Sequence, residues 1–267
     1  LQGANMVFIA AGMGGGTGTG AAPIVAQVAK DLGALTIAIV TRPFSFEGEK
    51  RRKNAIEGIN KLKENVDAII IVSNDKLMMM NGTRPISEAF AESDRVLAQS
   101  VKTITDLIVV PGVINLDFAD VRSTLKDKGL ALIGFGSGTG PKKANDAASS
   151  ALLSPLLEAS IHGAHSIIAN VTCGNNVSLD EVKEAIDYVT SAAGNNPNII
   201  FGVQANPELN DQMLISIVAT EFDNDFDPFS ENATPVVTPV TPLKEEQVEE
   251  DDGEEESILP SFLNGND

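Results

Sequence analysis

The sequence contains one cysteine, no tryptophan and one tyrosine in 267 residues, and these shortages limit what the chain can do. A single cysteine, Cys173, cannot form a disulfide within the chain, so we expect a reducing compartment. Long apolar runs are also missing, because no stretch reaches the roughly 18 residues that a membrane-spanning helix needs. No basic and apolar leader opens the sequence. We therefore expect a cytoplasmic protein that inserts no segment into a membrane.

Positive charge is scarce as well. The chain has 19 Lys and Arg residues against 37 Asp and Glu residues, which gives a net charge of −18. Binding of nucleic acid needs basic stripes that neutralise phosphates, so this balance argues against a nucleic-acid partner. The hydrophobic content of 43%, in contrast, is sufficient for a substantial core in one large or two modest domains.

A glycine-rich loop follows the first apolar segment. Residues 10–23 read AAGMGGGTGTGAAP, and the first eleven of these positions hold six glycines and two threonines. Glycine has no Cβ, so successive backbone N–H groups can converge on one anion. The helix expected at about 20–31 would direct the positive end of its dipole at the loop. We interpret this segment as a phosphate-binding unit; a turn that serves only packing is the alternative.

Two named phosphate motifs can be tested against this loop. A Walker A motif requires Gly-Lys-Ser/Thr, and the first lysine is Lys30, so that motif is absent. The dinucleotide pattern G-x-G-x-x-A fits Gly16, Gly18 and Ala21, which leaves an NAD-dependent oxidoreductase as an alternative function. The next strand, however, ends in Thr41-Arg42 where a ribose-binding acid is expected.

The order of apolar segments predicts an α/β fold in two parts. Expected strands at 6–11, 35–41 and 67–73 alternate with helices near 20–31 and 48–65, which indicates a parallel sheet with ligand loops at the carboxyl ends of its strands. A long central helix is expected at about 84–110. A second, α+β pattern follows, with strands near 130–136, 165–172, 198–205 and 212–220 and helices near 141–159 and 178–192. We expect a first domain over 1–110 and a second over 111–228, and we interpret GFGSGTGP at 134–141 as a strand-to-helix turn.

The two ends of the chain differ from the middle. The sequence starts without methionine and enters a strand almost at once, so we expect the first domain to be incomplete at its N-terminus. Residues 229–256 form an expected disordered linker, since nine of the twelve residues at 245–256 are acidic. Residues 257–267 restore apolar character and suggest a docking peptide on a tether; an inert tail is the alternative.

Several loops that follow strands carry residues able to recognise a nucleoside. These are the segments 41–48 and 73–76 and the start of the long helix, with Phe90 and Asp94. An amide and a carboxylate can pair with base edges, an aromatic ring can stack, and Arg51 can reach ribose or phosphate. The pair Asn74-Asp75 also suits a helix cap, and the two interpretations remain open for it.

A second acidic pair follows the long helix. Asp117 and Asp120 are three residues apart, so in a helical turn their carboxylates share one face. One interpretation makes Asp117 the N-cap of a helix that runs through 126 and Asp120 a first-turn residue that interacts with its dipole. This interpretation is compatible with a further, chemical role for the pair.

Taken together, these segments resemble the FtsZ family of bacterial tubulin-like GTPases. The resemblance covers essentially the whole chain and rests, in order, on GGGTGTG, TRPFSFEG, SNDK, PGVINLDFADV and ILPSF. It implies a tubulin-like fold: a parallel-sheet GTP-binding domain, a long central helix, a smaller α+β domain and a disordered tail. It also implies GTP and GDP as ligands, with Mg²⁺ bound through the phosphates. The family's activity would be head-to-tail polymerisation into the division ring, with the C-terminal peptide binding division proteins and membrane tethers at the division site.

The resemblance also implies roles for individual residues. Gly15, Gly16, Thr17 and Gly18 would hold the phosphates, Glu47 and Arg51 would lie near the ribose, and Asn74, Phe90 and Asp94 would bind guanine. Asn115, Asp117 and Asp120 would complete the site of the adjacent subunit and position the attacking water. The 267-residue chain alone is then expected to be inactive. A scaffold that binds nucleotide without turnover is a further alternative, against which Asp117 and Asp120 argue.

Overall fold

Three parallel strands end together at the edge where the glycine loop begins. The computed structural model describes residues 1–81, 85–157, 159–174, 176–194 and 196–222. In it, β1 (Met6–Gly12), β2 (Leu35–Arg42) and β3 (Ala68–Ser73) pair in parallel in that order. The register places Gly12 beside Thr41 and Arg42 beside Ser73. The three predicted strands are confirmed, and the loops that follow them start at one level.

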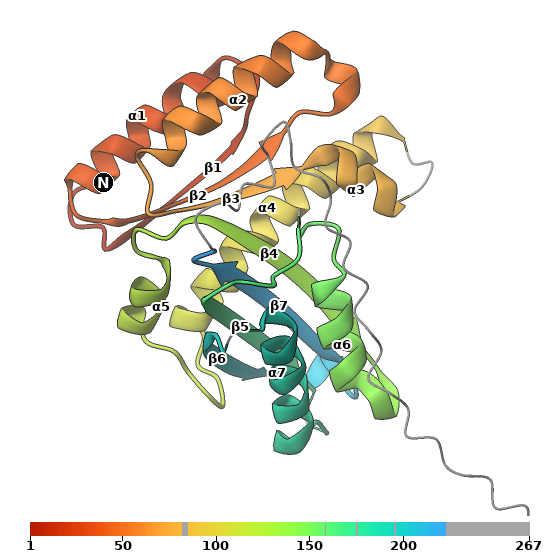
Figure 1. The fold of residues 1–267 in the computed structure, drawn as a ribbon. Coiled ribbons are helices and arrows are strands. Elements are labelled where there is room, and N and C mark those ends of the chain that lie inside the picture. The colour runs from red at the N-terminus through yellow and green to blue at the C-terminus, as the bar shows by residue number, and fades with distance from the viewer. Residues whose placement is uncertain (82–84, 158, 175, 195, 223–267) are drawn as a thin grey trace, which may run out of the picture. The chain divides into compact units, whose positions relative to one another are not determined.

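Helices α1 (Thr17–Asp31) and α2 (Glu49–Lys63) cover one face of these strands (Figure 1). Small residues of α1, such as Ala22, Ala26 and Ala29, pack with Ile59 and Leu62 of α2 in one apolar cluster over the sheet. Helix α1 begins three residues earlier than predicted, so Thr17 and Gly18 lie in its first turn.

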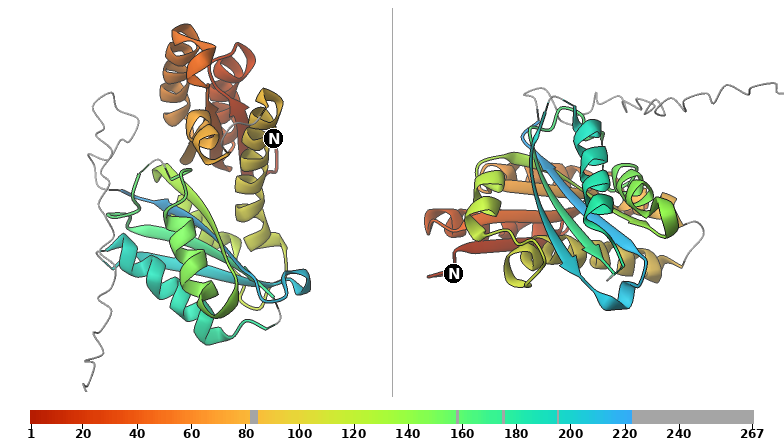
Figure 2. Two further views of the ribbon diagram at one scale, coloured as in Figure 1. Left: turned by 90° about the vertical axis from the view of Figure 1, so that its right-hand side faces the viewer. Right: turned by 90° about the horizontal axis from the view of Figure 1, so that it is seen from below.

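The long helix α4 (Ile86–Val109) covers the opposite face and confirms the predicted central helix. Figure 2 shows α4 running from the strands of the first half of the chain to those of the second. Its buried residues Ile104 and Leu107 belong to a cluster that holds both Ile37 of β2 and Val218 of β7. Two shorter helices flank α4: α3 (Asn74–Asn81), which follows β3 directly, and α5 (Phe118–Leu125). One core therefore connects the first half of the chain to the second.

The second half contributes four more strands to the same sheet: β4 (Gly129–Gly138), β5 (Ser166–Cys173), β6 (Asn198–Ala205) and β7 (Met213–Thr220). It also contains the helices α6 (Lys143–Leu152) and α7 (Leu179–Ala193). The strand order is β1-β2-β3-β4-β7-β5-β6. Strand β4 pairs in parallel with β3 and antiparallel with β7. The two predicted domains therefore share one seven-stranded sheet, and the boundary at 110/111 stays a prediction.

The glycine-rich segment at 134–141 is mostly strand, so its interpretation as a turn is wrong. Gly134, Gly136 and Gly138 all lie in β4. A Cβ on Gly136 would lie 2.1 Å from the carbonyl oxygen of Ala147. Glycine is needed here because α6 lies directly on the strand. Helix α6 is also shorter than the predicted 141–159.

Within the part of the chain that the structure describes, no helix is both long and apolar enough to cross a membrane. The predicted acidic linker at 229–256 and docking peptide at 257–267 lie outside the described residues.

Candidate functional site

The glycine loop between β1 and α1 has two kinds of glycine. Gly14 has φ +101° and donates its N–H to Oγ1 of Thr19 at 2.8 Å. A Cβ on Gly18 would lie 2.5 Å from the carbonyl oxygen of Gly12. Gly15 and Gly16, in contrast, are exposed, and a Cβ on either would meet no atom within 4 Å. The first kind shapes the loop, and the second leaves its outer surface clear of side chains.

The N-terminus of α1 is suited to bind an anion. Gly16 is its N-cap and offers no side-chain acceptor, and the first turn contains no acidic residue. The first N–H groups of a helix have no partner within the helix, and its dipole places partial positive charge there. All four predicted phosphate residues, Gly15, Gly16, Thr17 and Gly18, lie at this end. A phosphate fits this position on backbone chemistry alone.

The segment after β2, which includes the start of α2, lies against the glycine loop. A Cβ on Gly14 would meet the carbonyl oxygen of Arg51 at 2.8 Å, so α2 approaches the loop closely. Glu47 accepts a hydrogen bond from the N–H of Phe44 at 3.0 Å and forms an ion pair with Arg51 at 2.5 Å. The two predicted ribose residues, Glu47 and Arg51, are therefore partners of each other.

The predicted base-binding residues come from α3 and α4. Asn74 is 4% exposed, and its Oδ1 accepts a hydrogen bond from Oγ of Ser93 at 2.9 Å. The ring of Phe90 meets the ring of Phe44 edge-on, with centroids 5.0 Å apart. Asp94, adjacent to Ser93 in the chain, is exposed. The structure thus places Asn74, Phe90 and Asp94 at the edge where the glycine loop lies.

Sequence reasoning missed one connection in this group. The Oδ1 of Asp75 accepts a hydrogen bond from the N–H of Ser45 at 2.8 Å and thereby ties the loop after β2 to the start of α3. Nothing in the sequence pairs two residues 30 positions apart, beyond the expectation that parallel strands end at one edge.

A hollow of about 350 Å³ lies beside this group. None of the nine predicted GTP-binding residues lines it. Its lining residues are Arg42, Pro43, Phe44, Ser45, Gly48, Glu49, Arg52, Ala55, Ser73 and Asp75.

The predicted hydrolysis residues lie at the other end of α4. Asp117 is the N-cap of α5: its Oδ1 accepts from the N–H of Asp120 at 2.8 Å, and Oδ2 of Asp120 accepts from the N–H of Asp117 at 3.4 Å. Asn115 accepts from the N–H of Gly112 at 2.6 Å. All three side chains belong to exposed residues. Since α4 has 24 residues, its two ends are about 36 Å apart, and one chain does not bring the two sets together.

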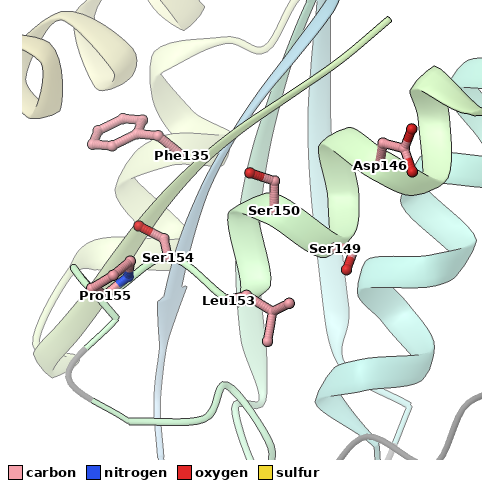
Figure 3. Close-up of a pocket in the computed structure, with 7 residues that line it drawn as sticks. All are labelled: Phe135, Asp146, Ser149, Ser150, Leu153, Ser154 and Pro155. Atoms are coloured by element: carbon pink, nitrogen blue, oxygen red, sulfur yellow. The ribbon is translucent and has the colours of Figure 1, made fainter. Parts of the chain in front are cut away.

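Figure 3 shows a second hollow, of about 430 Å³, between β4 and α6. Ser150 and Ser154 turn their hydroxyls toward the side of Phe135, whereas Asp146 and Ser149 point elsewhere. The polar groups therefore do not converge on a common point. Among the described residues, no group of three His, Cys, Asp or Glu side chains could hold a metal ion.

Comparison with known proteins agrees with the geometry. A family model described as "Tubulin/FtsZ family, GTPase domain" matches residues 1–82, and one described as "FtsZ family, C-terminal domain" matches residues 129–223. A solved structure of an empty FtsZ dimer from M. jannaschii is 42% identical, with a TM-score of 0.78 over 82% of this chain. The chain belongs to the tubulin/FtsZ family. The expected FtsZ-like, α/β fold is confirmed, and the dehydrogenase alternative is not favoured.

Further structures define how far the likeness extends. A point mutant of M. jannaschii FtsZ is 41% identical, with a TM-score of 0.78, and the matched region covers 82% of this chain and 66% of that one. CetZ1 from Haloferax volcanii, solved as a GDP-bound monomer, is 18% identical with a TM-score of 0.67, and this likeness concerns the fold alone. The FtsZ-like chain spans 64% of the length of the empty FtsZ dimer's chain.

Proposed function

We propose that this FtsZ-like chain belongs to a GTP-binding and GTP-hydrolysing cytoskeletal protein that polymerises head to tail, so that each subunit completes the hydrolytic site of its neighbour. One observation carries this proposal: the predicted GTP-binding residues and the predicted hydrolysis residues lie at opposite ends of α4. A subunit that cannot bring its acids to its own nucleotide can bring them to the nucleotide of the next subunit. A head-to-tail contact that does not close gives an open filament.

The nucleotide end supports GTP as the ligand. The α1 N-terminus would hold phosphates through Gly15, Gly16, Thr17 and Gly18, and Glu47 and Arg51 would contact the ribose side. Guanine presents a ring N–H and an amine where adenine lacks this pair of donors, and the exposed carboxylate of Asp94 can accept from both. Mg²⁺ would be bound through phosphate oxygens, as the family membership suggests.

The other end supports hydrolysis in trans. Asn115, Asp117 and Asp120 would position water beside the γ-phosphate of the adjacent subunit, and phosphoryl transfer depends mainly on such placement and charge. The family membership supports a role of these filaments in the bacterial division ring, at a cytoplasmic division site. The peptide at 257–267 would bind division proteins or membrane tethers there. The family relatives are longer than this chain, so we propose the activity for the complete gene product and expect residues 1–267 alone to be inactive.

A mixing experiment tests the in-trans arrangement. Asp120→Asn retains an acceptor oxygen for the helix cap and leaves the nucleotide residues of its own subunit unchanged, so GTP affinity should be preserved. Turnover should fall on the order of 10² to 10⁴-fold, because a positioned carboxylate is lost. Thr17→Ala subunits should have the opposite defect, with a weakened pocket and an intact acidic loop.

A mixed filament contains junctions that pair the intact pocket of one variant with the intact loop of the other. GTP turnover of the mixture should therefore exceed the sum of the two separate variants. If the variants co-assemble, as light scattering or sedimentation can show, and the mixture gains nothing, Asp120 acts within its own subunit or only as a cap.

A further inference from the structure

The loop that carries the proposed hydrolysis residues is attached to β6 by backbone hydrogen bonds. The carbonyl oxygen of Val203 accepts hydrogen bonds from the N–H of Val113 at 2.7 Å and from the N–H of Ile114 at 3.2 Å. The N–H of Val203 in turn donates to the carbonyl oxygen of Ile114 at 2.9 Å. Ile114 and Val203 thereby form an isolated antiparallel bridge. The loop between α4 and α5 is therefore placed by a strand that is about 90 residues away in sequence.

The neighbouring residues of β6 hold the end of α4. The Nε2 of Gln204 donates to the carbonyl oxygen of Asp106 at 3.0 Å. The same carbonyl accepts the N–H of Val110, the C-cap of α4, at 3.0 Å. On the other side of Val203, a Cβ on Gly202 would lie 2.7 Å from Cδ2 of Leu107, so glycine permits close approach of the strand to the helix. Gln204 is thus bonded to the carbonyl oxygen in the last turn of α4 that also accepts the hydrogen bond of the helix C-cap.

The acids themselves are fixed relative to this loop. Gly112 donates to the side chain of Asn115 at 2.6 Å, and Asp117 caps α5. A shift of the end of α4 is therefore transmitted along a short, hydrogen-bonded segment to Asp117 and Asp120. The backbone bridge holds Val113 and Ile114, whereas the Gln204 contact holds the last turn of α4, from which the segment departs.

We infer that Gln204 is a positioning residue for GTP hydrolysis: its amide holds the last turn of α4, and thereby sets where Asp117 and Asp120 meet the neighbouring subunit. This inference rests on the proposed function. Gln204 touches neither nucleotide nor water in it, and acts only through the Asp106 carbonyl. A displaced loop should slow the chemical step, because hydrolysis requires the acids to lie within hydrogen-bond reach of the water.

The test replaces the donor without changing the size of the side chain. Gln204→Glu places carboxylate oxygens against the Asp106 carbonyl, and neither can donate at neutral pH. Gln204→Lys retains an N–H donor, and a cation is favourable beside the last carbonyls of a helix. Gln99→Glu makes the same change at an exposed position of α4 and is the control. Turnover per assembled subunit, KM for GTP, GTP affinity and melting temperature are measured for the complete gene product.

We expect Gln204→Glu to lower kcat at least about tenfold, since a small misplacement of catalytic groups is costly, with GTP affinity and melting temperature close to those of the parent. Gln204→Lys and Gln99→Glu should retain most of the activity. Gln204→Glu should also regain turnover when mixed with Thr17→Ala subunits, and regain none when mixed with Asp120→Asn subunits, because the latter pair shares one defect.

Several results would overturn the inference. Parental turnover in Gln204→Glu shows that the contact does not position the loop. A turnover loss that follows melting temperature, or one that Gln204→Lys shares fully, assigns Gln204 a structural role only. Failure of the Asp120→Asn and Thr17→Ala mixture is a separate result, which removes the in-trans proposal. If that mixture works and the Gln204→Glu and Thr17→Ala mixture does not, the positioning inference alone is wrong.

Discussion

Asp117 and Asp120 already have a structural role, because they cap α5 in their own subunit. Each accepts a hydrogen bond from the backbone N–H of the other. Loss of such a cap costs about 1 kcal/mol of stability. Variants that test hydrolysis should therefore be Asn and not Ala, since Asn retains a side-chain acceptor for the cap.

We predict that Asp94→Asn weakens GTP binding selectively. The change replaces one acceptor oxygen by a donor that faces the donors of guanine, and a hydrogen bond to a charged group contributes about 1.5–3 kcal/mol, or roughly 10- to 100-fold in affinity. Titration with fluorescent GTP and ATP analogues should show a smaller ratio of GTP affinity to ATP affinity than in the parent protein. Glu92→Gln, on the same turn of α4, is the matched control. Equal losses for both nucleotides would show that Asp94 does not recognise the base.

A buried lysine at the start of α6 is expected to make folding depend on pH. The Nζ of Lys143 contacts Asp211 at 2.6 Å and Glu181 at 2.8 Å. Hydrogen bonds to Asp211 and then Glu181 raise the pKa of Lys143, and the lysine lowers the pKa of both carboxyl groups. The two carboxyl groups have a lower pKa in the folded protein than in the unfolded chain. They therefore stabilise the fold at pH values above their unfolded-state pKa, and this stabilisation is lost as the pH falls through their folded-state pKa. The pKa of Lys143 is higher in the folded protein than in the unfolded chain. Lys143 therefore stabilises the fold at pH values below its unfolded-state pKa, and this stabilisation is lost as the pH rises through its folded-state pKa.

We therefore predict that Lys143→Met lowers the melting temperature at neutral pH, because it leaves two carboxylates without their cation. The difference from the parent should shrink near about pH 3, where the carboxyl groups are increasingly protonated. Thermal unfolding across this range is the measurement, with the exposed neighbour Lys142→Met as control. A difference that is independent of pH would indicate lost packing and no ion pair.

Helices and strands with regular apolar periodicity could be predicted from the sequence, and most were correct. The alternation over the first 73 residues gave β1, β2, β3, α1 and α2, and the long periodic segment gave α4. Two features of the fold could not be predicted from the sequence, for physical reasons. Glycines at 134–138 normally mark turns, whereas here they permit α6 to contact β4. Strand β4 joins two halves because of a pairing with β3 that has no local sequence signal.

The same reasoning missed the contacts that assemble the site. The residue types at the strand ends indicated nucleotide recognition, but the bonds of Asp75 with Ser45 and of Gln204 with Asp106 connect residues 30 and 98 positions apart. Such pairs depend on register and helix placement, which composition and spacing do not encode. The roles assigned to the nine GTP-binding and three hydrolysis residues stay predictions.

We predict that the α6–β4 contact makes Gly136 the more sensitive of two glycines. In Gly136→Ala the new Cβ would lie 2.1 Å from the Ala147 carbonyl and 2.3 Å from the Ala151 nitrogen, so the helix must shift at a cost of about 1–3 kcal/mol. Gly20→Ala, in α1, meets no atom within 4 Å and should stabilise the helix by about 0.5–1 kcal/mol. Urea unfolding compares them. Similar effects of both substitutions would contradict the close contact.

At the scale of the whole molecule, α4 connects the two groups of residues that we propose for nucleotide binding and for hydrolysis. Its first turns adjoin the proposed nucleotide residues, and its last turn leads into the loop proposed to reach the neighbouring subunit. The core around α4 includes residues of β2, β3, β4, β5 and β7. The two ends are therefore parts of one packed body.

We predict that the C-terminal peptide is not needed for polymerisation. Removal of residues 257–267 from the complete gene product should leave GTP turnover and filament formation nearly unchanged, because in the sequence the acidic segment 229–256 lies between the peptide and the two matched domains. Recruitment to division partners should be lost. Sedimentation of polymers and a pull-down with membrane-tethering partners measure the two effects. Failure of the truncated protein to polymerise would contradict the prediction.

Strand β1 is the first strand in the sheet order, and this position has a consequence for handling the protein. Among the described residues only β2 pairs with it, so one row of its backbone N–H and C=O groups has no strand partner. Its sequence, MVFIAAG, has no charge and no proline to prevent pairing with another chain. We therefore expect residues 1–222 expressed by themselves to aggregate through strand addition at β1, and a charged residue introduced into this strand to oppose it.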